Sequence, residues 1–313
     1  MSKHKFIIVT PSYSSNSGGV IVLHKLCDVI NSLGGEAYVY PYEENYQLNN
    51  LNFIKVISKF LLRRFTYYLR PFKMNPKFKT KRLPISPYQL SPEWITIYPE
   101  TVFGNPLNSK KVVRWLLNNP SHNFETGENN KAFFYGPGEL YFRIGPWFDE
   151  FYYPQSKTSA SYLQVFDYPL DLYNEKDVSP IRFGSAYLVR KGVAKKIVHD
   201  LNDSICIDGM KHSQIAKIFK SVQYFYSYDS ISTFSQLAVL CGAISVVIPD
   251  ENKSADVWMP NQQDRLGIAY GFDDIDFAIS TSHKLKEYIN SYETRNKSSV
   301  INFFKEVDEF FDN

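Results

Sequence analysis

The residues best suited to chemistry lie in one short turn between a predicted strand and a predicted helix. The stretch 224–249 reads YFYSYDSISTFSQLAVLCGAISVVIP, and its turn carries Asp229, Ser230 and Ser232. We expect the N–H groups of Ser230, Ile231 and Ser232 to open the helix, where N–H groups lack helical partners and the dipole is positive. Such a helix start binds phosphate. Helix capping is the compatible alternative, and Asp229 would either cap the helix or hold a ribose or sugar hydroxyl.

The residues around this turn predict a strand, a helix and a second strand. The first strand ends at Phe225, and apolar residues from Phe234 to Cys241 recur at i, i+3, i+4 and i+7, the buried stripe of a helix. Gly242 ends that helix, and the apolar run 244–248 forms a buried strand.

Two cations precede this unit in the chain. Arg190 and Lys191 follow a predicted strand, FGSAYLV, and so lie at the end where open α/β sheets bind ligands. We expect them to bind a diphosphate, with a solvated turn as the alternative. The apolar spacing from Val193 to Leu201 predicts a helix directly after them.

A further βαβ unit opens the chain. FIIVT is a buried strand, PSYSSNSGG a loop, and the next apolar stripe a helix that leads to the strand AYVYPY. Gly18 and Gly19 close the loop, where glycines let a donor or an acceptor approach the backbone. A tight loop without a ligand is the alternative. The loop has no GxGxxG fingerprint, which argues against a dinucleotide-dependent dehydrogenase.

The length and the element pattern fit two α/β domains. A chain of 313 residues is too long for one typical domain, and alternating strands and helices predict open parallel sheets. We expect a first domain at 1–172, a polar linker at 170–180, a second domain at 181–295 and an amphipathic helix at 296–313. Three scattered cysteines, no signal-peptide pattern and no bilayer-length apolar run predict a cytoplasmic protein with reduced thiols.

Positive charge is concentrated in the segment 45–92, which holds ten basic residues and no acidic one. Lys55, Lys59, Arg63 and Arg64 lie beside an apolar helical stripe, a pattern typical of a helix at an anionic membrane surface. A groove for an acidic acceptor and a solvated face are the alternatives.

Taken together, these motifs resemble the GT-B glycosyltransferases, bacterial ones above all. NSGGVIVLHKLCDVINSLGGEAYVY looks like their opening loop and helix, and SAYLVRKGVAKKIVHD looks like the start of their donor domain. YSYDSISTFSQLAVLCGAISVVIP is similar to their donor-phosphate segment, and DRLGIAYG resembles a turn of lipopolysaccharide and capsule members. The resemblance covers both domains. It implies an α/β GT-B fold, with two Rossmann-like domains facing across a cleft and the terminal helix crossing back to the first.

The resemblance implies that the first domain binds an acceptor and the second a nucleotide sugar. Retaining members place two glutamates seven residues apart across the donor helix. Here Asp229 stands near the first position and Gln236 stands seven residues later, which is a departure from that pattern. An inverting transferase needs a base near the acceptor hydroxyl. The candidates are Glu100 and His122 at strand ends and Asp167 within a strand predicted at 162–168, YLQVFDY, and a structural role is the alternative for each. Stereochemistry stays open between inverting and retaining.

We expect no bound metal and no cofactor. Asp274 and Asp276 form a DxD pattern, but they precede a predicted helix, where carboxylates favour the dipole. The six histidines show no pair with metal-ligand spacing.

The sequence therefore predicts transfer of a sugar from a nucleotide-sugar donor to a lipid-linked or oligosaccharide acceptor of the cell surface, of lipopolysaccharide, O-antigen or capsule type. The enzyme would sit peripherally on the inner face of the cytoplasmic membrane. A non-catalytic carbohydrate- or nucleotide-binding module is the alternative. Nucleic-acid binding is disfavoured, because the charge outside 45–92 is net acidic and no nucleic-acid motif occurs.

Overall fold

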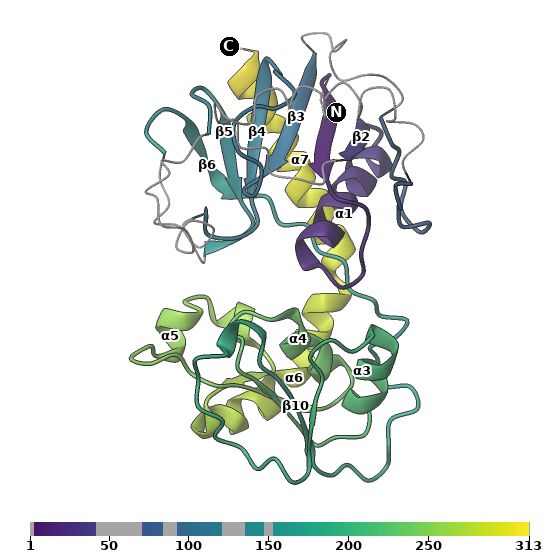
Figure 1. The fold of residues 1–313 in the computed structure, drawn as a ribbon, viewed down its shortest axis with the longest axis vertical. Helices are drawn as coiled ribbons and strands as arrows, with labels where there is room; N and C mark the ends of the chain where they lie inside the picture. The colour runs from purple at the N-terminus through teal and green to yellow at the C-terminus, as the bar shows by residue number, and fades with distance from the viewer. Residues whose placement is uncertain (1–2, 42–70, 84–92, 121–134, 147–152, 313) are drawn as a thin grey trace, which may run out of the picture. The chain divides into compact units, whose positions relative to one another are not determined.

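The computed structural model describes residues 3–41, 71–83, 93–120, 135–146 and 153–312. These residues form two compact units (Figure 1). The first comprises residues 1–167 together with 293–313, and the second comprises 168–292. Each unit is built on one parallel sheet with helices, so the prediction of two Rossmann-like α/β units is confirmed.

The first unit contains a six-stranded parallel sheet in the order β2-β1-β3-β4-β5-β6. Alternate residues of β1 face opposite sides. Phe6 and Ile8 join the core that includes the helices, whereas Ile7 and Val9 pack against Val102 on the other face. The strands are β1 (Lys5–Thr10), β2 (Glu36–Pro41), β3 (Trp94–Pro99), β4 (Lys111–Leu116), β5 (Leu140–Arg143) and β6 (Lys157–Tyr162).

Among the described residues of this unit, two helices contribute to its core, α1 (Gly18–Ser32) and α7 (Tyr292–Phe311). Helix α7 buries one face, and the Phe303 ring lies 5.5 Å from that of Phe6 in β1. Figure 1 shows α7, in yellow, alongside the purple and blue strands of this sheet. The helix expected at the end of the chain therefore begins at Tyr292 and completes the first core.

The strand expected at 162–168 does not form beyond Tyr162. Strand β6 ends at Tyr162, and side chains of α7 bind the backbone beyond it. Ser299 Oγ accepts a hydrogen bond from Gln164 N at 2.8 Å, and Asn296 Oδ1 accepts one from Phe166 N at 3.0 Å. The N–H groups that a sheet neighbour would use are thus bound by the helix.

The second unit contains a five-stranded parallel sheet in the order β11-β10-β9-β7-β8. The predicted strand–helix–strand unit is confirmed as β9, α4 and β10. The strands are β7 (Ser185–Leu188), β8 (Ser204–Cys206), β9 (Tyr224–Ser227), β10 (Ile244–Val247) and β11 (Ile268–Tyr270). The α-helices are α3 (His212–Phe219), α4 (Thr233–Leu240), α5 (Ala255–Trp258) and α6 (Ile275–Asn290).

Two local predictions in this unit are wrong. The helix expected at 193–201 does not form, and Val193 is 79% exposed. The backbone N–H of Val198 binds the side chain of Tyr228 instead of a helical carbonyl. The segment 170–180, expected as a linker, belongs to the second unit, where the buried Tyr173 places its hydroxyl 2.8 Å from His212 Nδ1.

Among the helices of the described residues, none is long and apolar enough to cross a membrane. Most of the basic segment, including Lys55, Lys59, Arg63 and Arg64, lies outside the described residues.

Candidate diphosphate site of the second unit

Polar and charged residues gather at the carboxyl edge of the second sheet. Strands β10, β9 and β7 are neighbours and parallel, so the residues that follow them meet at one edge. Arg190 and Lys191 follow β7, the turn 228–232 follows β9, and Asp250 follows β10. The structure therefore brings the two predicted cations and the predicted turn into one place.

A glycine lets the cationic loop approach the turn. A Cβ atom on Gly192 would lie 2.1 Å from the carbonyl oxygen of Tyr228. Any residue with a side chain would clash there, so the close approach requires glycine. Arg190–Gly192 form a short 3-10 turn, in which Arg190 has φ of 38°. The Arg190 guanidinium lies 4.9 Å from the centre of the Phe234 ring in the first turns of α4. Cation–π attraction and the close approach both hold Arg190 beside the helix start.

The turn itself caps the helix. Ser232 is the N-cap residue of α4, and its Oγ accepts a hydrogen bond from Phe234 N at 3.3 Å. Asp229 Oδ1 accepts one from Ile231 N, also at 3.3 Å. The helix begins at Thr233, so Ser230 and Ile231 lie in the turn before it and not in its first turn. The capping role of Ser232 is present in the structure, and a phosphate role stays a prediction.

Asp229 is buried beside the cations. Burial raises the pKa of its carboxyl, and the hydrogen bond from Ile231 and the charges of Lys191, Arg190 and Lys195 oppose that rise. Because these cations act on Asp229 through space, their positive field reaches the turn. An anion bound there would meet the same field.

Lys195 is the main residue that the sequence reasoning missed. Its Nζ donates to Ser230 Oγ at 2.8 Å and to the carbonyl of Ile248 at 2.6 Å, and it pairs with Asp250 at 2.7 Å. Ser230 also donates to Asp250 at 2.6 Å. Burial acts to raise the pKa of Asp250, but the hydrogen bonds from Lys195 and Ser230 outweigh it and lower the pKa. The sequence feature that could have indicated this residue is that Lys195 closely follows Arg190 and Lys191 in the chain.

The predicted glycines belong to the first unit. Gly18 begins α1 and Gly19 follows it, with Ser17 as the N-cap residue. A Cβ on Gly18 would meet no atom within 4 Å, and one on Gly19 would lie 3.6 Å from Leu117. Packing therefore does not require glycine at either position, and a ligand role for them stays a prediction.

The candidate bases have different surroundings. The buried Glu100 accepts a hydrogen bond from Leu117 N at 3.0 Å, which ties the end of β3 to that of β4. Asp167 lies 3.9 Å from Lys25 Nζ, and burial raises the pKa of its carboxyl while Lys25 lowers it. His122 lies outside the described residues.

The DxD carboxylates sit at a helix start. Asp274 is the N-cap residue of α6 and its Oδ2 accepts from Tyr270 N at 3.1 Å, and Asp276 lies in the first turn. Within the described part of the chain, one group has ligand-like spacing, His4 with Asp308 and Asp312. Lys3 already pairs with Asp312 there at 2.9 Å.

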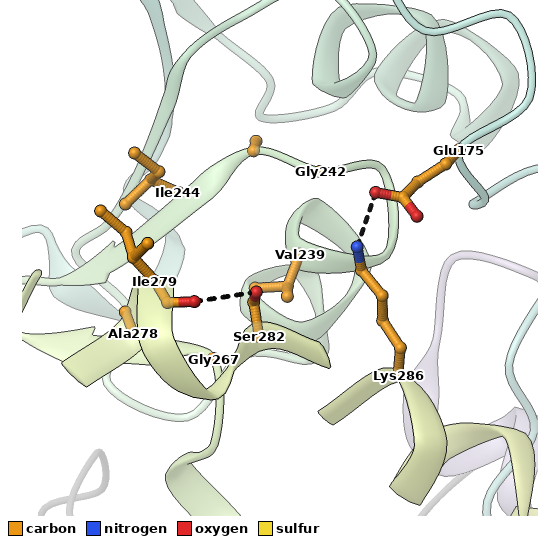
Figure 2. Close-up of a pocket in the computed structure, with 10 residues that line it drawn as sticks. Glu175, Val239, Gly242, Ile244, Gly267, Ala278, Ile279, Ser282 and Lys286 are labelled. Carbon is orange, nitrogen blue, oxygen red and sulfur yellow. Dashed lines mark hydrogen bonds and ion pairs between the residues drawn. The ribbon is translucent and has the colours of Figure 1, made fainter. Parts of the chain in front are cut away.

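A cavity of about 280 Å³ lies at the opposite, amino edge of the second sheet (Figure 2). Gly242 and Ile244 come from the start of β10, and Gly267 comes just before β11. Lys286 and Glu175 form an ion pair of 2.6 Å at its side. The residues that gather at the carboxyl edge do not line this cavity.

No family model matches the chain, and no curated protein matches it. Its structure is similar to sucrose-phosphate synthase from Thermosynechococcus elongatus, with a TM-score of 0.47 and 7% identity over 99% of this chain and 95% of that one. It is also similar to MurG of Acinetobacter baumannii, with a TM-score of 0.37 and 8% identity over 97% of this chain and 99% of that one. For the glycosyltransferase VinC in complex with dTDP, the TM-score is 0.35 and the identity 11% over 98% of this chain and 95% of that one. The likeness to these chains concerns the fold.

Proposed function

We propose that the chain is a glycosyltransferase of the GT-B type that uses a nucleotide-sugar donor. One observation carries the proposal: Arg190, Lys191 and Lys195 converge with the start of α4 at the carboxyl edge of a parallel sheet. A leaving nucleoside diphosphate develops negative charge, and cations with helix N–H groups stabilise it without a metal.

In this proposal the diphosphate competes for groups that now bind each other. Lys195 is held by Asp250 and Ser230, and Arg190 lies on the Phe234 ring. An arriving diphosphate would take hydrogen bonds from both cations, while Asp250 keeps Lys195 oriented toward the turn. Asp229 would bind a ribose or sugar hydroxyl from the same turn.

The first unit would bind the acceptor and supply any base, with Glu100, His122 and Asp167 as candidates. Asp167 has the more suitable environment of the two described candidates, because burial raises its pKa toward the range of a general base. We propose a lipid-linked or oligosaccharide acceptor of the bacterial cell surface, and contact of Lys55, Lys59, Arg63 and Arg64 with anionic lipid. The basic residues beside an apolar stripe support the lipid contact, and the resemblance to bacterial GT-B enzymes supports the acceptor.

A non-catalytic nucleotide- or carbohydrate-binding module is the second candidate. Gln236 stands where retaining enzymes have a glutamate, and it accepts a hydrogen bond from Tyr168 at 3.0 Å. Glu100 is likewise bound to a backbone N–H. Both side chains therefore have internal structural partners.

The test is a thermal-shift screen of UDP, GDP, CMP, ADP and dTDP, followed by turnover of the matching nucleotide sugars. A bound nucleotide raises the melting temperature by mass action. A shift with turnover supports the transferase, and a shift without turnover of any sugar supports the binding module. The absence of a shift with every nucleotide contradicts the transferase and the nucleotide-binding module.

A further inference from the structure

The loop 189–203 carries Arg190, Lys191 and Lys195, the three cations of the proposed site, and it forms no α-helix. At its start, Val189 N donates to Asp208 Oδ2 at 2.9 Å, and Gly192 rests against the backbone of Tyr228. Lys195 lies after these two contacts. Its position therefore also depends on what fixes the loop beyond it.

The hydroxyl of Tyr228 provides that second fixed point. Tyr228 is fully buried directly after β9. Its oxygen accepts a hydrogen bond from Val198 N at 2.9 Å and lies 2.7 Å from Nδ1 of His199. One residue thus contacts the loop on both sides of Lys195, through its backbone at Gly192 and through its hydroxyl at 198–199.

The imidazole of His199 packs against two tyrosines of neighbouring strands and has a hydrogen-bond partner at each nitrogen. The ring lies 4.6 Å from that of Tyr226 and 4.9 Å from that of Tyr187. Its Nε2 is 3.0 Å from Ser204 Oγ at the start of β8. With the ring proton on Nε2, Nδ1 accepts from the Tyr228 hydroxyl and Nε2 donates to Ser204 Oγ; with the proton on Nδ1, both directions reverse. Burial lowers the pKa of His199, which agrees with a neutral ring, although Asp200 opposes that shift.

We propose that His199 is a positioning residue for the diphosphate site: its bond to Tyr228 fixes the loop so that Arg190 and Lys195 face the turn before α4. The inference rests on the proposed function. His199 does not touch the ligand in this role, and it acts through Tyr228 and the loop backbone. The Nδ1 bond carries the effect, and the Nε2 bond to Ser204 only orients the ring.

Three substitutions separate these contributions. The side-chain amide of His199→Asn takes the place of Nδ1, and that of His199→Gln takes the place of Nε2. His199→Phe keeps an aromatic ring against the two tyrosines and loses both hydrogen bonds. The exposed His283 of α6 provides the matched control, His283→Gln.

The measurement is calorimetric affinity for the nucleoside diphosphate that gives the largest thermal shift and for the corresponding monophosphate. We expect His199→Gln and His199→Phe to bind the diphosphate about tenfold more weakly, the upper range for one hydrogen bond, and His199→Asn to stay near the parent. The monophosphate should lose less affinity, because the loop cations hold the diphosphate. The melting temperature of each variant without nucleotide shows whether it is folded.

The outcomes are distinct. Parent-like diphosphate affinity in all three variants overturns the inference and leaves the proposed function intact. Equal loss for monophosphate and diphosphate, or equal loss in Asn and Gln, shows a general structural role and also overturns it. If the parent binds no nucleotide, the proposed function fails and the inference fails with it. If His199→Phe does not fold, the comparison of Asn with Gln still decides.

Discussion

Lys195 and Asp250 form an ion pair of 2.7 Å between two loops that follow different strands of the second sheet. The pair fixes the lysine next to Ser230, at the start of the turn that precedes α4. A cation held in this way is already oriented when an anion arrives, so little side-chain entropy is lost on binding.

The first prediction concerns the loop cations. Lys191→Ala, Lys195→Ala and Arg190→Ala should each weaken nucleoside-diphosphate binding by about 1.5–3 kcal/mol, the range for a hydrogen bond to a charged group. Lys196→Ala, an exposed neighbour, is the control and should bind as the parent does. Isothermal titration calorimetry measures the effect, and unchanged affinity in all three variants would remove this site.

The second prediction concerns the glycine under the loop. Gly192→Ala should destabilise the second unit by about 1–3 kcal/mol, the cost of overpacking, because its Cβ would meet the Tyr228 carbonyl at 2.1 Å. Gly18→Ala is the control, since a Cβ there meets no atom within 4 Å. Chemical denaturation gives the free energy of unfolding for both, and equal stability would show that the loop moves away at no cost.

The third prediction concerns a buried ion pair in the first unit. Arg114 in β4 donates from Nε and Nη2 to the two carboxylate oxygens of Glu139, at 3.0 and 2.7 Å, and both side chains are buried. Arg114→Met should cost about 3–5 kcal/mol, because it leaves a buried carboxylate without its partner. The double variant with Glu139→Gln should recover part of the loss. A double variant no more stable than Arg114→Met would show that the carbonyl contacts of Arg114 with Val102 and Gly104 carry the effect.

The fourth prediction is that turnover needs no divalent metal, because cations and the helix start supply the positive charge. Activity should persist in EDTA and should not rise with manganese. Loss in EDTA with recovery in manganese would contradict this and direct attention to Asp274 and Asp276.

The fifth prediction concerns the basic segment. Changing Lys55, Lys59, Arg63 and Arg64 to Gln should release the protein from anionic vesicles, since each cation near such a surface contributes about 1 kcal/mol. Nucleotide binding should survive. Sedimentation with vesicles of varied anionic lipid content measures the change, and a parent that stays in the supernatant at moderate salt would show that the segment serves another purpose.

Local sequence patterns predicted a helix or strand correctly where the segment's own residues determine its secondary structure. The stripe from Phe234 to Cys241 gave a helix followed by a buried strand, as observed. The same spacing from Val193 to Leu201 predicted a helix that is absent, because Tyr228, distant in sequence, binds the backbone there. Lys195 was missed for the same reason: its partners Ser230 and Asp250 become neighbours only when the parallel strands align. Periodicity reports which face is buried, whereas a site depends on contacts between loops of different strands.

Because α7 supplies Val300, Phe303 and Phe304 to the first core, that unit is discontinuous in sequence and the second is an uninterrupted insertion. During synthesis the ribosome therefore releases all of residues 168–292 before the first core can close. The later half of the chain can finish folding first, the reverse of the usual vectorial order. A fragment cut at residue 167 would keep its six strands and expose the apolar surface that α7 covers, so circular permutation is the route to an isolated first unit.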